Sequence, residues 1–162
     1  MQQDAPDLAE VLPGRWFVRA TNFPMWLGGA RREPVFEYGV VKTSPLVLSD
    51  DVSYAVADGR VKHIVGRDRV GGDGFVWRGR GVLKPIRSRW QVTGVSADGN
   101  LMAIRFSKSI ATPAGIDILE REGVHNPELR AAVAADTARY RLTMEDFASL
   151  TWLPARAGDD TL

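Results

Sequence analysis

The chain has 162 residues, of which 44% are apolar and 25% are charged, and its formal net charge at pH 7 is +1. These values are typical of a single soluble globular domain over residues 1–162, and the near-zero charge gives no indication of nucleic-acid binding. Cysteine is absent, which excludes a disulfide framework, a thiolate nucleophile and a cysteine-based metal site.

The N-terminal residues 1–10 carry three acids, and no apolar segment of the kind found in secretory signals follows them. We therefore expect a cytoplasmic protein whose ends, residues 1–10 and 155–162, are frayed. No apolar run approaches the ~18–20 residues that span a bilayer, so no membrane span is expected.

The first apolar run, Leu12–Val18, contains a Gly-x-Trp formed by Gly14 and Trp16 and is expected to be a strand. The segment Asn22–Gly29 is too rich in Pro and Gly for a regular element, yet it holds large apolar side chains. We expect it to be a loop that covers a cavity, with Phe23, Met25 and Trp26 as a lid.

Short runs rich in Val, Ile, Trp, Tyr and Phe follow, separated by turn residues. Asp58-Gly59 and Asp98-Gly99 are strong hairpin signals, because Asp-Gly readily adopts positive φ. Seven further strands are predicted, at Val35–Thr43, Val52–Ala57, Arg60–Arg69, Phe75–Leu83, Ser88–Val95, Leu101–Ser107 and Ile116–Arg121. Eight antiparallel strands joined in sequence predict an all-β, up-and-down barrel over about residues 12–121, a size that holds one small ligand.

The period of the pattern then changes to that of a helix. Asn126 is a good N-cap and Pro127 fits the first helical position, so one amphipathic α-helix is predicted over about residues 126–141. Thr143 with Asp146 indicates a cap for a short turn within a terminal apolar segment, residues 143–153, which could add a strand.

A Gly-x-Trp on the first strand, seven further strands and one helix after the barrel resemble the lipocalin family of the calycin superfamily. Gly115–Arg121 looks like the family's third signature, an aliphatic strand that ends in arginine. The resemblance implies structural roles for Gly14, Trp16 and Arg121, with Arg121 packed over Trp16 at the closed end of the barrel. A guanidinium stacked on an indole is worth ~0.5–2 kcal/mol.

The chain departs from the family at Ala97–Asn100, where typical members carry a Thr-Asp-Tyr-like motif. It is more similar to small intracellular lipocalin-like proteins of bacteria and fungi, and the likeness covers most of residues 12–153. The segments that carry it are Trp77–Leu83, Ser88–Gly94 and Thr112–Asp117. That group implies a fold and no single shared activity.

Alternation along the strands predicts which side chains line the interior. Candidate ligand-binding residues are Phe23, Met25, Trp26, Phe36, Tyr38, His63, Trp77, Trp90 and Arg105. Plain core packing is the alternative for each of the aromatic residues.

Several polar residues are candidate catalytic groups, namely His63, Tyr38, Tyr54, Arg105 and Asp117. His63 points inward if Lys62 faces solvent, where it could act as an acid or base, bind a ligand or ligate haem, or be a satisfied structural histidine. Arg105 is either a surface residue or a buried cation, and a buried Asp117 could pair with it. No metal site and no cofactor are expected, since the two histidines are far apart and cysteine is absent.

Two functions remain open. The first is binding of a small hydrophobic or amphipathic molecule in the barrel, as a monomer or homodimer. The second is a cofactor-free cyclase, isomerase or pericyclase of specialised metabolism, acting on a polyketide-like or terpenoid-like substrate in the same cavity. No catalytic signature is present, but a closed barrel can catalyse such steps by shape and desolvation.

Overall fold

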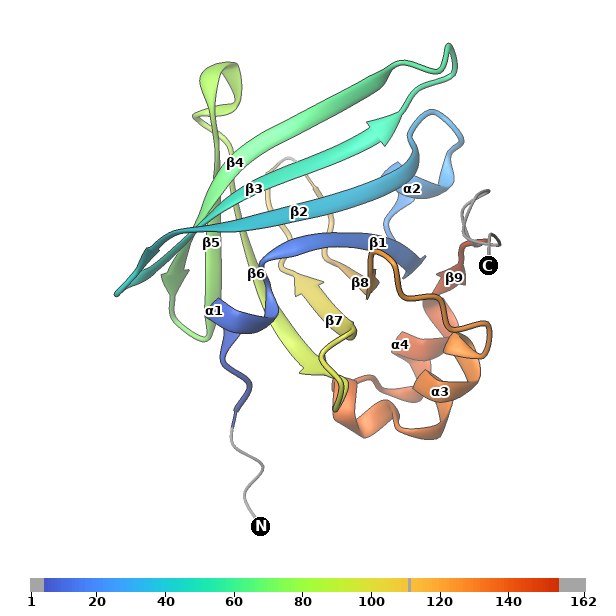
Figure 1. Cartoon of the computed structure of the whole chain (residues 1–162). Coiled ribbons are helices and arrows are strands. Elements are labelled where there is room, and N and C mark those ends of the chain that lie inside the picture. Colours follow the sequence, from blue (N-terminus) through green and yellow to red (C-terminus); the bar gives the residue numbers. More distant parts are fainter. Residues whose placement is uncertain (1–4, 111, 155–162) are drawn as a thin grey trace.

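The computed structural model describes residues 5–110 and 112–154, and it is built mainly of strands (Figure 1). The strands are β1 Gly14–Thr21, β2 Arg32–Thr43, β3 Leu46–Ala55, β4 Val61–Gly71, β5 Gly74–Gly79, β6 Arg87–Val95, β7 Leu101–Phe106, β8 Gly115–Arg121 and β9 Thr151–Trp152. The helices are α1 Leu8–Val11, α2 Pro24–Leu27, α3 Leu129–Ala135 and α4 Met144–Ser149, with 3-10 turns η1 Gly81–Leu83 and η2 Thr137–Tyr140.

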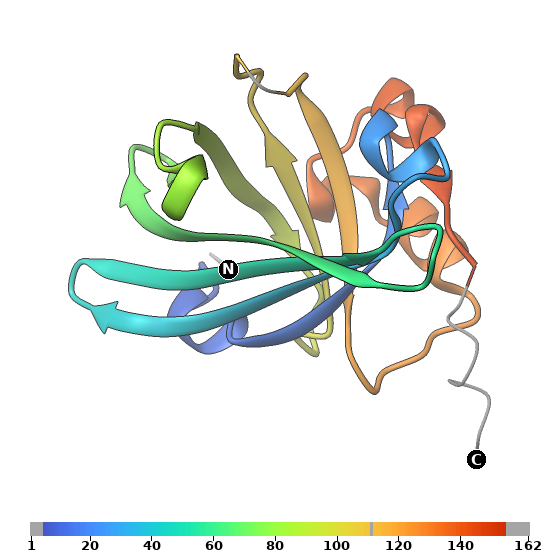
Figure 2. The same cartoon turned by 90° about the horizontal axis from the view of Figure 1, so that it is seen from above.

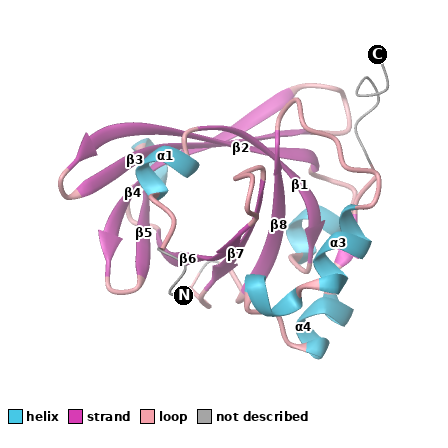
Figure 3. Ribbon diagram, turned by 60° about the horizontal axis from the view of Figure 1, so that its bottom comes forward, coloured by secondary structure: helices cyan, strands magenta, loops and turns pink. Residues whose placement is uncertain are grey.

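Strands β1 to β8 form a closed antiparallel barrel. Each strand pairs with the next along the chain, and β1 pairs with both β8 and β2, which closes the sheet. Figure 3 shows the strands encircling one axis, with α3 and α4 outside the ring. The predicted eight-stranded antiparallel up-and-down barrel with a C-terminal helix is therefore confirmed.

The C-terminal segment covers the outer face of β1, β7 and β8, beside which its helices lie in Figure 2. Apolar side chains of this segment, among them Leu129, Val133 and Tyr140, pack on outward residues of the barrel such as Ile116 and Ile118. Strand β2 pairs with the first half of β1, from Gly14 to Phe17. Strand β9 pairs with Ala20 and Thr21 on the same edge of β1, beyond the end of the pairing with β2. The barrel thus has one apolar core inside it and a second between sheet and helices.

The single helix expected over residues 126–141 is wrong in its extent. Helix α3 ends at Ala135, and Asp136 adopts φ −145° while its carboxylate accepts from the backbone N–H of Arg139. Asp136 therefore caps a separate turn, η2, because a short acidic side chain competes for backbone donors within a helix. The capping box of Thr143 and Asp146 is present at α4.

The N-terminal end also differs from expectation. Residues 1–10 were predicted to fray, yet Leu8–Val11 form helix α1, which begins where the Asp7 carboxylate accepts from Ala9 N at 3.0 Å. Residues 1–4 and the expected frayed end 155–162 lie outside the described residues. No helix in the described part of the chain is long and apolar enough to cross a membrane.

Candidate functional site

One end of the barrel is closed by Trp16 and Arg121. Trp16 is fully buried, and the Arg121 guanidinium lies 4.2 Å from the centroid of its ring. Arg121 also donates to the carbonyls of Val11 (2.6 Å), Pro13 (3.0 Å) and Gly99 (3.2 Å). A single cation therefore satisfies three backbone carbonyls from two segments at this end, as the family resemblance implies.

Gly14 and Leu12 complete this closed end. Gly14 has φ +118°, and a Cβ there would lie 3.1 Å from the Arg121 guanidinium. Trp16 Nε1 donates to the carbonyl of Leu12 at 2.9 Å, and Leu12 is itself fully buried beneath α1. Because every polar group here has a partner, this end is a structural plug rather than a binding site.

The opposite mouth is covered by residues 22–29, which we call the lid. The lid contains helix α2 and is therefore more regular than the loop predicted from the sequence. Phe23 packs edge-on against Phe106 at 5.4 Å, and Trp26 contacts Tyr54 at 5.9 Å between ring centroids. Met25 packs against the same core while partly exposed.

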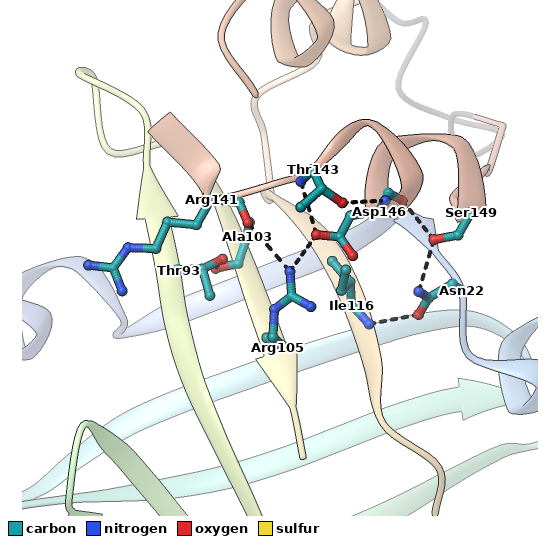
Figure 4. A network of polar contacts seen from close by, with 9 residues as sticks. All are labelled: Asn22, Thr93, Ala103, Arg105, Ile116, Arg141, Thr143, Asp146 and Ser149. Carbon is teal, nitrogen blue, oxygen red and sulfur yellow. Dashed lines mark hydrogen bonds and ion pairs between the residues drawn. The ribbon is translucent and has the colours of Figure 1, made fainter. Parts of the chain in front are cut away.

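Asn22 anchors the start of the lid to β8 and α4 (Figure 4). Its side chain accepts from Ile116 N at 2.7 Å and donates to Ser149 Oγ at 3.1 Å. Next to this, the Phe23 ring lies directly over Gly115, where an added Cβ would collide with it. The first two residues of the lid are therefore fixed by hydrogen bonds and by packing over Gly115, whereas Met25 and Trp26 are held by packing against the core.

Stacked aromatic rings fill the middle of the barrel. Trp90 lies between Phe75 and Tyr38, with ring centroids 4.7 and 5.6 Å away and interplanar angles of 24° and 23°. Phe36 and Phe106 extend the stack at 6.3 and 6.1 Å. The rings therefore form a contiguous apolar surface inside the barrel.

Two aspartates, Asp50 and Asp68, point into this aromatic region. Asp50 opposes Gly66 and Asp68 opposes Leu48 across β3 and β4, which places both carboxyls on the inner face. They are 4% and 0% exposed and close enough to share a proton. Trp90 Nε1 donates to Asp68 Oδ1 at 2.7 Å.

The environment raises the pKa of the two carboxyls to different extents. Burial raises the pKa of Asp50 well above its usual range, and the neighbouring Asp68 charge raises it further. Burial also raises the pKa of Asp68, but hydrogen bonds from Asp50 and Trp90 lower it again. Burial therefore favours the protonated form of both carboxyls, and more strongly for Asp50 than for Asp68.

A third carboxyl, Asp117, faces the interior from β8 below the lid. It is 1% exposed, and neither of its oxygens has a hydrogen-bond partner. Burial raises its pKa to about 7, and the nearby hydroxyl of Thr21 offsets this only in part without reaching hydrogen-bonding geometry. Asp117 is thus the buried aspartate that the sequence suggested.

Tyr38 is close enough to all three carboxyls to be affected by their charges. Its hydroxyl is buried without a hydrogen-bond partner. Burial raises its pKa well above the usual range, and the charges of Asp50, Asp68 and Asp117 add to that effect. We call Tyr38, Asp50, Asp68 and Asp117 the acidic cluster.

The inward orientation predicted for His63 is wrong. Its ring is 51% exposed and its Nδ1 lies 2.8 Å from Asp51 on the outer face of the sheet. Ile64 packs inside instead, and Lys62 shares the inner face with Tyr54 at the mouth. A lysine at this position reaches solvent through the open end of the barrel. Its positive charge is therefore no sign that the residue lies on the outer face of the sheet.

Arg105 also lies outside the barrel, and it does not pair with Asp117. It donates to Asp146 at 2.9 Å and to the carbonyl of Arg141 at 3.4 Å, which joins β7 to α4 (Figure 4). The hydrogen bond from Arg105 lowers the pKa of Asp146. His63 and Arg105 are therefore not available to a ligand in the interior.

The remaining candidates face the interior. Phe36, Tyr38 and Trp90 lie in the stack, Trp77 packs its indole over Gly66, and Tyr54 lies at the mouth under Trp26, with Arg31 5.4 Å from its ring centroid. Sequence reasoning missed Asp50 and Asp68. The alternation Leu48-Asp50-Val52-Tyr54 and the outward arginines on either side of Asp68 were the signals that could have found them.

Two hollows are present on the outside of the barrel. One, of about 320 Å³, lies over the outer faces of β3 and β4 and is lined by charged residues such as Glu37, Arg67 and Arg80. The other, of about 410 Å³, lies between α3 and α4. Within residues 5–110 and 112–154, no group of three or more His, Asp or Glu side chains is arranged to hold a metal ion.

Known structures with the same architecture share little sequence with this chain. The siderocalin Ex-FABP, which functions through dual ligand specificities, aligns with a TM-score of 0.60 and 13% identity over 91% of this chain and 97% of its own. Lobster apocrustacyanin A1 aligns with a TM-score of 0.62, and apocrustacyanin C1 with 0.63, at 9% and 10% identity, each over 91% of this chain and 79% of its own. No protein-family model matches the sequence, and a comparison with curated proteins gives no match.

Proposed function

Because the chain has a lipocalin-like fold, we propose that it binds a small amphipathic molecule inside the barrel. The observation that carries the proposal is the acidic cluster next to the aromatic stack. Buried polar atoms nearly always have hydrogen-bond partners in native proteins. Among the described residues, six oxygens on the inner face lack them, namely Tyr38 Oη, Asp50 Oδ1, Asp68 Oδ2, Ser88 Oγ and both Oδ atoms of Asp117.

A stability role does not account for these atoms. Each buried polar group without a partner costs ~1–3 kcal/mol, whereas apolar side chains at the same positions would stabilise the fold. Such a cost is retained where a ligand supplies the missing partners. The aromatic rings supply the apolar part of the site, so the ligand is amphipathic.

The ligand enters through the lid. Its far part, from Pro24 to Gly29, closes the mouth by the contact of Trp26 with Tyr54, whereas the opposite end of the barrel is sealed by Trp16 and Arg121. Entry requires Trp26 to swing outward and the stacked rings around Trp90 to separate. Similarity to a siderocalin that functions through ligand binding supports the same use of the barrel.

Binding of the neutral dye Nile red tests this proposal. We expect saturable binding with rising dye fluorescence, and Val92→Phe, which narrows the interior, should weaken it by about tenfold, or ~1.4 kcal/mol. Ala131→Arg, in the outer hollow between α3 and α4, is the matched control and should leave binding unchanged. The proposal fails if no saturable binding occurs, or if only Ala131→Arg removes it.

The same site supports a second candidate, a cofactor-free cyclase or isomerase. The observation in its favour is the Asp50–Asp68 pair, which offers a proton donor and an acceptor side by side in a dry interior. Comparing the compound released from wild type with that released from Asp50→Asn separates the two functions. Binding alone predicts the same compound in both, whereas catalysis predicts product in wild type and substrate in the variant, resolved by chromatography.

A further inference from the structure

The buried carboxyls inside the barrel have no ion-pair partners. Among the described residues, none of the seven ion pairs involves Asp50, Asp68 or Asp117. The groups that favour ionisation of these carboxyls are hydrogen-bond donors without positive charge, namely the Asp50 carboxyl and the Trp90 indole for Asp68 and the Thr21 hydroxyl for Asp117. The three carboxyls are therefore buried without an ion-pair partner among the described residues.

Basic residues at the two ends of the barrel are directed away from these carboxyls, and Lys62, on the inner face at the mouth, is exposed to solvent. Arg121 stacks on Trp16 and donates to three carbonyls at the closed end. Arg31 lies over the outer ring of the mouth, Tyr54. Buried acidic groups are normally paired with a cation or neutralised, and a cationic ligand would supply the partner that these carboxyls lack.

The aromatic residues around the acidic cluster favour the same charge. The faces of Tyr38 and Trp90 stack beside the carboxyls, with their centroids 5.6 Å apart. The π-face of an aromatic ring attracts a cation and repels an anion, most strongly when water is excluded. Tyr38 adds a hydroxyl without a hydrogen-bond partner, and the charges of all three carboxyls act on it.

We propose that the ligand carries a basic nitrogen, and that this ammonium group binds between Asp50, Asp68 and Asp117 with its apolar part in the aromatic stack. This inference rests on the proposed function and names its ligand class. The ammonium donates to the carboxylate of Asp68 and to Asp117, and Tyr38 Oη accepts a further hydrogen bond. An acidic ligand is excluded by the same charges.

Three probes of similar size and different charge test the proposal at pH 7.5: 2-phenylethylamine, propylbenzene and 3-phenylpropionate. Quenching of tryptophan fluorescence reports binding. We expect the amine to bind at least about tenfold tighter than propylbenzene, since a charge-assisted hydrogen bond in a dry site exceeds that ratio. The carboxylate should bind more weakly than either.

Variants of isosteric size locate the effect. Asp68→Asn, Asp117→Asn and Tyr38→Phe should each weaken binding of the amine by about tenfold or more and leave propylbenzene unchanged. Asp51→Asn is the matched control, because Asp51 is next to Asp50 on the same strand but faces outward toward His63. It removes one carboxylate and should not change binding of any probe. Circular dichroism establishes that each variant is folded.

The outcomes separate this inference from the function on which it rests. Equal binding of amine and propylbenzene, or loss of amine binding in Asp51→Asn alone, overturns the ammonium site while leaving a binding barrel. Binding of Nile red without binding of any of the three probes likewise overturns the ammonium site and leaves the binding barrel. Absence of binding by Nile red and by all three probes overturns both.

Discussion

Replacing Trp16 with alanine is expected to lower the free energy of unfolding by ~3–5 kcal/mol, the range for removing a large buried aromatic side chain. Trp16 is fully buried, donates to the Leu12 carbonyl and carries the Arg121 guanidinium on its ring. Its loss would leave a cavity and free Arg121 at the closed end. Urea unfolding followed by circular dichroism measures the change without relying on tryptophan emission.

Trp16→Phe is the control for this prediction. It retains an aromatic ring at the plug but loses the Nε1 hydrogen bond, so the loss should be smaller, about 1–2 kcal/mol. A loss below about 1 kcal/mol for Trp16→Ala would contradict the structural role of Trp16.

Replacing Asp117 with asparagine is expected to stabilise the protein by about 4 kcal/mol at pH 8 and to have almost no effect near pH 4. The pKa of Asp117 is raised from an ordinary 3.8 to about 7 by burial, so folding favours its neutral form. Between these two values the folded state binds more protons than the unfolded state, and stability falls as pH rises. The difference between the two pKa values of Asp117 corresponds to a loss of about 4 kcal/mol in the free energy of unfolding above pH 7.

Asparagine is isosteric with the protonated acid and does not ionise, which removes this penalty. Unfolding of wild type and variant in urea at a series of pH values measures this penalty. Asp50 and Asp68 contribute equally to both proteins, so the difference in the free energy of unfolding reports Asp117 alone. Asp98→Asn is the opposite control. Hydrogen bonds from Ser96 and from Asn100 N lower the pKa of Asp98. That variant should therefore be less stable than wild type at neutral pH, and the difference should disappear in acid, where wild type also loses this contribution. Stability of Asp117→Asn that stays parallel to wild type across this range would contradict the burial of an acid at this position.

The barrel was predictable because its signals are local. Alternating apolar residues and the turns at Asp58-Gly59 and Asp98-Gly99 predict the strands and their antiparallel order. The Gly-x-Trp and the arginine that ends β8 predict the contact between Trp16 and Arg121. The break of the C-terminal helix at Asp136 was not predictable in the same way, since it depends on a side chain that turns back to the backbone of Arg139.

The interior was predicted in part, and one error in strand parity explains most of what was missed. Taking Lys62 as an outward residue turned His63 inward and, by the same alternation, turned Asp68 outward. In the barrel, inward positions near the mouth reach solvent, so a lysine there is compatible with the inner face. Asp50 was missed because the predicted strand began at Val52, whereas β3 begins at Leu46.

Placement of Arg105 and Asp117 needed the tertiary structure. Both lie on strands with apolar neighbours on each side, because β7 and β8 are covered inside by the barrel core and outside by the C-terminal helices. A strand that is buried on both faces loses the alternation that distinguishes them. Only the pairing of Arg105 with Asp146 and the packing of Leu119 inside the barrel determine which face each residue occupies.

Native mass spectrometry of the full-length protein purified from its own host tests the central claim, that the barrel carries a small molecule, most directly. The account predicts a second charge-state series displaced by one small-molecule mass, which disappears when the protein is unfolded and yields a compound that migrates as a cation. Only the mass of the chain itself, under conditions that preserve non-covalent complexes, would contradict the account.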